Sequence, residues 1–172
     1  MSKNIVLTGL MGSGKTTVGR LLSNKLNKKF IDTDEWIENE EKLSINEIFS
    51  SFGESYFRNL ETKAIKKICV AENQIISTGG GTVEKPENIE ILKNNSIIFY
   101  LYAPASELYK RIKDEKNRPL LNNSNPEETL YNLLNKRKDF YALCDVKIVT
   151  TGKNVDQIVC EIIEKFGNLQ QV

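Results

Sequence analysis

A chain of 172 residues is long enough for one domain with a sizeable core and too short for two ordinary domains. Hydrophobic residues make up 40% and charged residues 27%, and the net charge of +1 gives neither nucleic acid nor an anionic membrane an obvious surface to bind. The apolar runs are far shorter than a membrane span, and no charged-then-apolar leader precedes the first predicted strand. We expect one soluble, cytoplasmic domain over residues 1–172.

The first predicted element is a buried strand over residues 4–8, and residues 9–16 then have the form G-x-x-x-x-G-K-[ST]. A helix is expected next, because apolar residues recur at helical spacing at Val18, Leu21, Leu22 and Leu26. Glycines let successive N–H groups cradle phosphate, and the helix adds its positive end. Lys15 and Thr16 would serve the outer phosphates and Mg²⁺. A chance match in a glycine-rich turn is the alternative, but the flanking elements favour a nucleoside triphosphate site.

Residues 30–34 predict a short strand that ends in Asp32 and Asp34. Ligands of an open parallel sheet collect outside the carboxyl ends of its strands. If the strand continues through Thr33, alternation places both carboxylates on one side, where they would serve a ligand or metal. The alternative is that these acids only cap and stabilise the start of a helix.

Two helices are predicted next, and an acid interrupts the apolar face of the second. Ser44 and Glu47 form a capping box for a helix that Gly53 ends and whose apolar face holds Ile45, Ile48, Phe49 and Phe52. The helix over residues 54–71 has a stripe formed by Phe57, Leu60, Ala64 and Ile68. Glu61 falls inside this stripe, with Arg58 three residues earlier. The two are either a structural ion pair or an acid that orients an arginine toward an anionic ligand.

A strand over residues 74–78 runs directly into a triple glycine at 79–81. Such glycines allow a ligand to approach the backbone closely, although a flexible turn would also use glycine. Most phosphate-loop enzymes place a magnesium-ordering Asp at the end of this strand, where Ser77 and Thr78 stand here. Asp32 is therefore the candidate for the missing acid.

The next predicted elements are a helix from Pro86, a strand over residues 97–102 and a helix from Pro104 that carries Arg111. Residues 113–125 are polar and poorly periodic, which is typical of a lid or of disorder. Within them, the run Arg118-Pro119-Leu120-Leu121 would suit a lid that delivers an arginine and then excludes water.

The helix predicted from Pro126 has an apolar stripe that Arg137 and Tyr141 continue. An arginine on a buried face is costly unless it is paired or faces a cleft, so Arg137 either contacts a ligand or snorkels to the surface. A strand over residues 146–150 and an amphipathic helix over residues 155–166 follow. Alternation of strands and helices predicts a single α/β domain whose five-stranded parallel sheet is flanked by helices.

Residue usage narrows the chemistry. Histidine is absent, so acid–base or metal chemistry must rest on carboxylates, lysines or hydroxyls. The three cysteines are odd in number and set in apolar patterns, which predicts reduced thiols in the core: Cys69, Cys144 and Cys160. Only five of the 24 basic residues are arginines, which marks positions where a bidentate donor is needed: Arg20, Arg58, Arg111, Arg118 and Arg137.

Together these segments resemble the shikimate kinases over nearly the whole chain. The resemblance lies in G-L-M-G-S-G-K-T-T-V-G-R-x-L from Gly9, F-I-D-T-D-E-W-I from Phe30 and G-E-x-x-F-R-x-x-E from Gly53. It continues in S-T-G-G-G from Ser77, R-P-L-L and R-x-x-x-Y. It implies a phosphate-loop kinase fold with a mobile lid at about 113–125 and an acceptor-binding segment at about 34–61. The implied reaction is ATP-dependent phosphorylation of shikimate to shikimate 3-phosphate, in aromatic amino acid biosynthesis.

For the nucleotide, the resemblance implies that Thr16 and Asp32 hold the Mg²⁺ cofactor. Arg118 would reach the transferring phosphate with the lid, and Arg111 would flank the adenine. The implied ATP-binding residues of the phosphate loop are Gly12, Ser13, Gly14, Lys15, Thr16 and Thr17.

For the acceptor, the resemblance implies that Asp34 binds ring hydroxyls and orients or deprotonates the accepting one. Arg58 and Arg137 would clamp the carboxylate, and Glu61 would brace Arg58. The implied shikimate-binding residues are Asp34, Arg58, Gly79, Gly80, Gly81 and Arg137. The implied catalytic residues are Lys15, Asp34 and Arg118. The expected partners are the small molecules ATP and shikimate, and the expected oligomeric state is a monomer.

Two other classes of function stay open at this point. Gluconate kinases and small nucleoside or nucleotide kinases are the nearest alternatives, although a base-stacking acceptor would want more aromatic lining. A nucleotide switch or a silent binding module is the other, although the chain has no Asn-Lys-x-Asp guanine-reading stretch.

Overall fold

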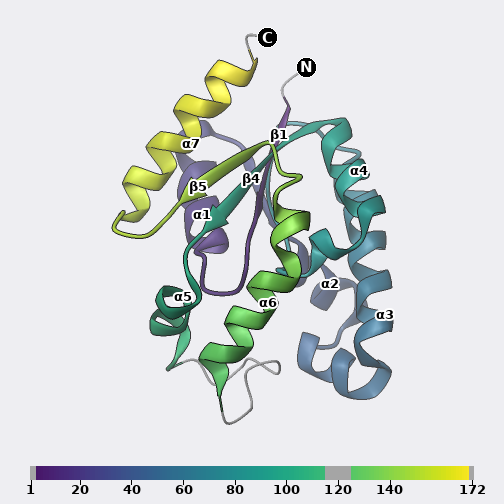
Figure 1. Ribbon diagram of the computed structural model, residues 1–172. Helices are drawn as coiled ribbons and strands as arrows, with labels where there is room; N and C mark the ends of the chain where they lie inside the picture. Colours follow the sequence, from purple (N-terminus) through teal and green to yellow (C-terminus); the bar gives the residue numbers. More distant parts are fainter. Residues whose placement is uncertain (1–2, 115–124, 171–172) are drawn as a thin grey trace.

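The computed structural model describes residues 3–114 and 125–170, so Arg118 and most of the predicted lid lie outside the described residues. All five strands of its sheet run parallel, in the order β2-β3-β1-β4-β5 (Figure 1). The strands are β1 (Asn4–Thr8), β2 (Lys29–Asp32), β3 (Gln74–Ser77), β4 (Ser96–Tyr102) and β5 (Val146–Val149). The central strands are buried on both faces, as expected of a parallel sheet between two helical layers.

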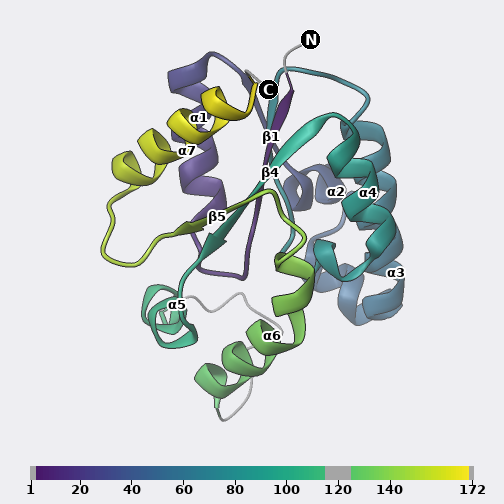
Figure 2. The same ribbon diagram turned by 45° about the horizontal axis from the view of Figure 1, so that its top comes forward.

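Helices cover both faces of the sheet and its carboxyl end (Figures 1 and 2). One face carries α1 (Lys15–Leu26) and α7 (Val155–Gln170). The other carries α2 (Thr33–Glu41), α3 (Ile45–Ile68) and α4 (Pro86–Asn94). The short 3₁₀ helix η1 (Thr82–Glu84) and the helices α5 (Ala105–Ile112) and α6 (Pro126–Tyr141) lie toward the carboxyl ends of the strands. The predicted α/β fold is confirmed.

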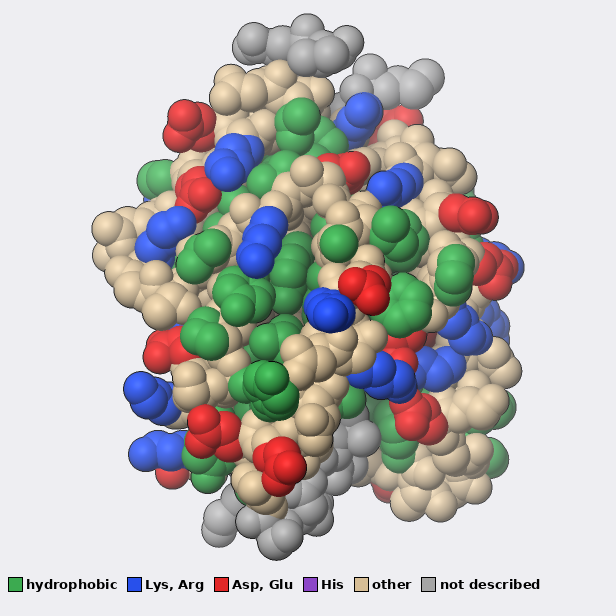
Figure 3. Space-filling view, in the orientation of Figure 1, with side chains coloured by type: hydrophobic (Ala, Val, Ile, Leu, Met, Phe, Trp, Pro, Cys, Tyr) green, Lys and Arg blue, Asp and Glu red, His purple; other side chains and the backbone are tan. Residues whose placement is uncertain are grey.

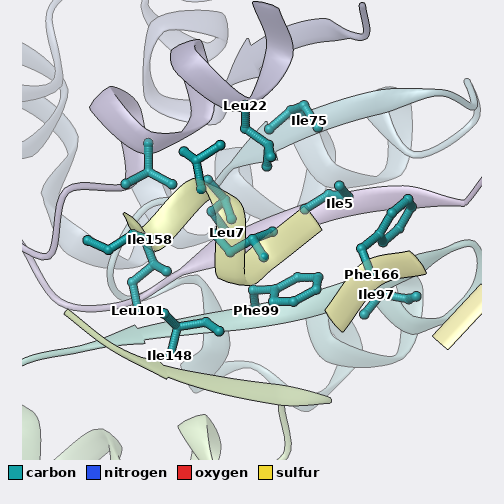
Figure 4. Close-up of a cluster of buried hydrophobic side chains, with 13 residues drawn as sticks. Ile5, Leu7, Leu22, Ile75, Ile97, Phe99, Leu101, Ile148, Ile158 and Phe166 are labelled. Atoms are coloured by element: carbon teal, nitrogen blue, oxygen red, sulfur yellow. The ribbon is translucent and has the colours of Figure 1, made fainter. Parts of the chain in front are cut away.

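The alternating side chains of β1 divide the core into two layers. Ile5 and Leu7 pack with α1 and α7 in the cluster drawn in Figure 4, whereas Val6 packs with α2, α3 and α4. Both layers are dry and tightly buried, so the sheet is a rigid base for the loops that follow β1 and β3.

On the outer surface, basic and acidic side chains are interspersed over the face seen in Figure 3. Within residues 3–114 and 125–170, no helix has the length and apolar character needed to cross a bilayer.

Three local expectations are wrong. The strand expected over residues 30–34 ends at Asp32, because Asp32 caps α2, which begins at Thr33. Phe52 is 53% exposed and packs on Tyr56 next to the kink that Gly53 (φ 80°) makes in α3, whereas Ile48 on the same predicted face is fully buried. Cys160 is exposed, since it lies on the opposite side of α7 from the buried stripe. The other two cysteines are partly buried, and all three thiols are free.

Candidate active site

A cleft of about 670 Å³ lies where β1, β2 and β3 end. Nearly all the described residues predicted for the site line this one cavity: Gly12, Gly14, Lys15, Thr16, Thr17, Asp32, Asp34, Arg58, Glu61, Gly79, Gly80, Gly81, Arg111 and Arg137. Among the described candidates, Ser13 alone does not line the cleft, and its buried hydroxyl lies beneath the loop. Elements far apart in the sequence therefore meet in one cavity.

The phosphate loop has the backbone shape that its glycines permit. Gly12 (φ 79°) and Gly14 (φ 92°) adopt left-handed conformations, and Gly14 begins α1 without a side-chain cap. The first N–H groups of α1 thus face the cleft as donors for an anion. Lys15 Nζ donates to the carbonyl oxygens of Gly9 (2.9 Å) and Leu10 (3.2 Å), which holds the ammonium group across the loop.

Arg111 joins the loop to the segment after β5. Its Nη1 donates to Thr150 Oγ1 (3.1 Å) and to the Gly12 carbonyl (3.4 Å), and its guanidinium also pairs with Glu107 (3.3 Å). Arg111 therefore stands at the edge of the phosphate loop, and its planar side chain is held from both sides.

Thr16 and Asp32 form an oxygen-rich pair beside the loop. Thr16 Oγ1 donates to Asp32 Oδ2 (2.9 Å), while Asp32 Oδ1 accepts from the backbone N–H of Asp34 (3.1 Å). Asp32 thus serves as helix cap and reaches the phosphate loop at the same time. A hydroxyl and a carboxylate oxygen fit Mg²⁺, which commonly takes one or two protein oxygens and leaves its other positions to phosphate and water. Within residues 3–114 and 125–170, no group of three or more acidic, cysteine or histidine side chains is arranged so that it could hold a metal ion by itself.

Asp34 is the most perturbed carboxyl group of the cleft. Its Oδ1 atom is buried and has no hydrogen-bond partner within the described residues. Burial raises its pKa from the ordinary 3.8 to about 7, and the nearby charges of Asp32 and Glu61 add to the rise while Lys15 opposes it. Such a carboxyl group is poised to exchange a proton near neutral pH.

Arg58 is held between two carboxylates. Its Nη1 pairs with Glu61 Oε2 (2.6 Å) and its Nη2 with Glu54 Oε1 (2.8 Å). Glu61 is only 1% exposed, and its second oxygen accepts from Thr82 Oγ1 (2.8 Å). The ion pair predicted from the spacing is confirmed, and Arg58 also lines the cleft, so the orienting interpretation stays a prediction.

The triple glycine leaves space for these charged groups. A Cβ on Gly81 would lie 2.5 Å from the guanidinium of Arg58, and one on Gly79 would lie 2.5 Å from Glu61 Oε1 and 2.9 Å from Asp34 Oδ1. Glycine is thus required here by close approach of side chains from α2 and α3, which a merely flexible turn would not require.

Arg137 reaches the cleft from α6 and is 2% exposed, which excludes the snorkelling alternative. Its Nε (2.8 Å) and Nη2 (2.7 Å) both bind Glu84 Oε1. Beside it, Tyr141 donates to the Gly80 carbonyl (2.8 Å) and stacks on Tyr100 at 4.2 Å. The arginine therefore sits in a rigid, mostly apolar setting with one carboxylate partner.

Several lining residues were not assigned to the site from sequence. Phe49 and Phe57 form an apolar wall, although their spacing predicted only core positions. Polar side chains from α2, from the N-cap of α3 and from its first turn also line the cleft: Glu38, Ser44 and Asn46. Glu84 is the other omission, because its partner is 53 residues away and no local spacing marks the pair.

The sequence and the fold of this chain are both similar to those of known proteins. A family model described as shikimate kinase matches residues 11–166. A shikimate kinase of Caldicellulosiruptor bescii is 49% identical over 148 residues, covering 86% of each chain. The structure of shikimate kinase from Acinetobacter baumannii in complex with shikimate is 36% identical, covers 98% of this chain and 94% of that chain, and has a TM-score of 0.94. A gluconokinase from Sinorhizobium meliloti (17% identical, TM-score 0.65, covering 97% and 93%) shares the fold.

Proposed function

This chain belongs to the shikimate kinase family, and from that premise we propose how its own residues carry out the family reaction. The chain transfers a phosphoryl group from ATP to a hydroxyl of shikimate, giving shikimate 3-phosphate and ADP. The observation that carries the proposal is a single cleft with a phosphate loop on one side and a buried carboxyl group with two inward arginines on the other.

On the donor side, the loop amides and Lys15 bind the phosphates of ATP, and Arg111 flanks the adenine. Thr16 and Asp32 would hold Mg²⁺, which would neutralise negative charge on the phosphates of ATP. Their hydrogen bond of 2.9 Å places a hydroxyl and a carboxylate oxygen together at the start of α1. Arg118, which lies outside the described residues, would add positive charge from the lid.

On the acceptor side, Arg58 and Arg137 bind the carboxylate of shikimate. Two planar guanidinium groups select a carboxylate more strictly than lysines would, because each offers a fixed fork of donors. The polar backbone of Gly79, Gly80 and Gly81 lines the space between the arginines and Asp34.

Asp34 accepts the proton of the attacking hydroxyl as the new P–O bond forms and the bond to ADP breaks. Its raised pKa supports this role. A carboxyl group with a pKa near 7 is partly ionised at neutral pH, and its carboxylate form readily accepts a proton because burial disfavours the charge. Phosphoryl transfer has a loose transition state, so alignment by Asp34 and charge neutralisation by Lys15 do most of the work.

A substrate panel tests the function directly. Purified chain with Mg·ATP is given shikimate, gluconate, adenosine or cytidine, and ADP release is followed. Turnover confined to shikimate supports the proposal, whereas comparable turnover of gluconate would contradict it. We also propose a cytoplasmic monomer; the free thiols suit a reducing compartment, and gel filtration with light scattering tests the monomer.

A further inference from the structure

Glu84 stands outside every residue role given so far, yet it touches the acceptor arginine. It ends η1, just after the triple glycine, and its side chain is 16% exposed. Its Oε1 accepts from both Nε and Nη2 of Arg137, at 2.8 and 2.7 Å. Its Oε2 pairs with Lys136 Nζ at 2.7 Å, so both carboxylate oxygens are engaged.

These contacts use the Nε–Nη2 edge of the Arg137 guanidinium. A guanidinium is planar, with its five N–H donors in a fixed fork, so holding the Nε–Nη2 edge fixes the direction of Nη1. Nη1 lies beside Gly80, 3.6 Å from where a Cβ on that glycine would stand, and Arg137 lines the cleft. The edge that Glu84 does not occupy therefore faces the backbone of the acceptor site.

Two groups hold the Arg137 guanidinium in place. Tyr141, which stacks on Tyr100, also forms a side-chain hydrogen bond with Arg137, but Glu84 is the carboxylate that binds it through two nitrogens. Burial pushes the pKa of Glu84 upward, but the hydrogen bond from Lys136 and the charge of Arg137 outweigh it, so the pKa is lowered overall. Glu84 is therefore an ionised partner at neutral pH.

We propose that Glu84 is a positioning residue of the acceptor site, which holds Arg137 by its Nε–Nη2 edge and thereby directs Nη1 to the carboxylate of the acceptor. The inference rests on the proposed function and deepens it. Arg58 offers a partial parallel, since the buried Glu61 binds its Nη1. Each acceptor arginine then has its own internal carboxylate, one from α3 and one from η1.

A purely electrostatic role of Glu84 and an orienting role predict opposite changes in acceptor binding, so one substitution distinguishes them. Glu84 places a negative charge close to the site of an anionic substrate, so neutralising it should strengthen binding if only the electrostatic potential mattered. If Glu84 acts by orientation, the same change should weaken binding, because Arg137 is freed to rotate and loses the fixed fork.

The experiment measures KM for shikimate, KM for ATP, kcat and the melting temperature of Glu84→Gln. We expect the shikimate KM to rise at least fivefold, with the ATP KM and kcat within twofold of wild type. Glu84→Asp keeps the charge but places it one methylene further from Arg137, so its shikimate KM should lie between the values of wild type and Glu84→Gln. Glu87→Gln is the matched control, because Glu87 is an exposed, lysine-paired acid on α4 outside the cleft, and its KM should not change.

A double-mutant cycle then tests whether Glu84 acts through Arg137. In an Arg137→Ala background, Glu84→Gln should raise the shikimate KM no further. An unchanged or lowered KM in folded Glu84→Gln, or an equal rise without Arg137, would overturn the positioning role. If Glu84→Gln does not fold, Glu84→Asp decides by the same criteria. A wild-type chain that turns over ATP with another acceptor but not shikimate would instead overturn the proposed function and the inference with it.

Discussion

The two halves of the cleft are built in different ways. The proposed donor half is built on one continuous segment, residues 9–17, whose backbone groups are directed by glycine conformations and by α1, with Asp32 and Arg111 added from other elements. The acceptor half comes from side chains of α2, α3, η1 and α6, held by ion pairs. The difference indicates that nucleotide binding is a property of local backbone, whereas acceptor choice depends on long-range placement of a few charged groups.

The largest expected effect falls on Asp34, because it belongs to the acceptor half and takes part in the reaction. Asp34→Asn should lower kcat by about 10²- to 10⁴-fold, the usual contribution of a general base, while ATP affinity stays within twofold. Single-turnover assays and calorimetric titration with an ATP analogue measure the two halves separately. Glu35→Gln, an exposed neighbour paired with Arg20, serves as control. Near-normal turnover of Asp34→Asn would remove this residue from the mechanism.

Substitution of Arg58 or Arg137 should separate the two halves of the cleft through the KM values for shikimate and ATP. Arg58→Ala and Arg137→Ala should each raise the shikimate KM at least tenfold, or about 1.4 kcal/mol, because each removes a bidentate donor from the carboxylate site. The ATP KM should move less than twofold, since neither residue belongs to the donor half. Steady-state kinetics with each substrate varied in turn checks this. Unchanged shikimate KM in both variants would mean that the carboxylate binds elsewhere.

The pH profile tests the same half without mutation. With the pKa of Asp34 at about 7 in the free enzyme, kcat/KM for shikimate should fall about tenfold per pH unit below 7 and level off above it. ATP-analogue affinity over the same range provides the comparison with the donor half. A flat kcat/KM profile from pH 5.5 to 8 would contradict the perturbed carboxyl group.

The free energy of unfolding should also depend on the protonation of Asp34. Protonation should increase stability, although it lowers kcat/KM. The folded pKa of Asp34 lies above its unfolded value of 3.8, so the folded state binds the extra proton between these two values. The contribution of Asp34 to the free energy of unfolding is therefore present below pH 4 and lost as pH rises through about 7. Asp34→Asn lacks this loss, so its stability relative to wild type should be greater at pH 8 than at pH 5, as urea unfolding would show.

The smallest effect comes from the triple glycine. Gly81→Ala should raise the shikimate KM a few-fold, because the new Cβ would displace the Arg58 guanidinium, which can shift only at the end of its flexible chain. Gly167→Ala is a matched control, since its Cβ meets nothing within 4 Å and it lies inside α7. This control should keep its KM and gain about 0.5–1 kcal/mol of stability. A wild-type KM in Gly81→Ala would show that Arg58 does not need this space.

The contrast between the halves also explains what could be predicted from sequence. The phosphate loop and the Arg58–Glu61 pair are local patterns, so spacing revealed both. Gly53 correctly marked a break in the helix, but the apolar pattern placed the exposed Phe52 on the same face as the buried Ile48. Scarcity of arginine marked Arg20 together with the cleft arginines, although Arg20 pairs with Glu35 at the surface, lies over the Phe30 ring and does not line the cleft.

Contacts between residues far apart in the sequence could not be predicted from residue spacing, for a physical reason. Glu84 and Arg137 meet because η1 and α6 pack together at the carboxyl end of the sheet, and neither segment encodes that contact alone. The need for glycine at 79 and 81 likewise comes from Asp34, Glu61 and Arg58 on other elements. Resemblance to a family supplied the roles that spacing could not.

A crystal structure of this chain with shikimate and ADP tests the central claim most directly. The account predicts that the shikimate carboxylate lies between Arg58 and Arg137, with one ring hydroxyl within hydrogen-bond distance of Asp34 and the ADP phosphates on the loop. Shikimate bound away from these three side chains, with ADP in its expected place, would contradict the acceptor half and leave only the nucleotide site standing.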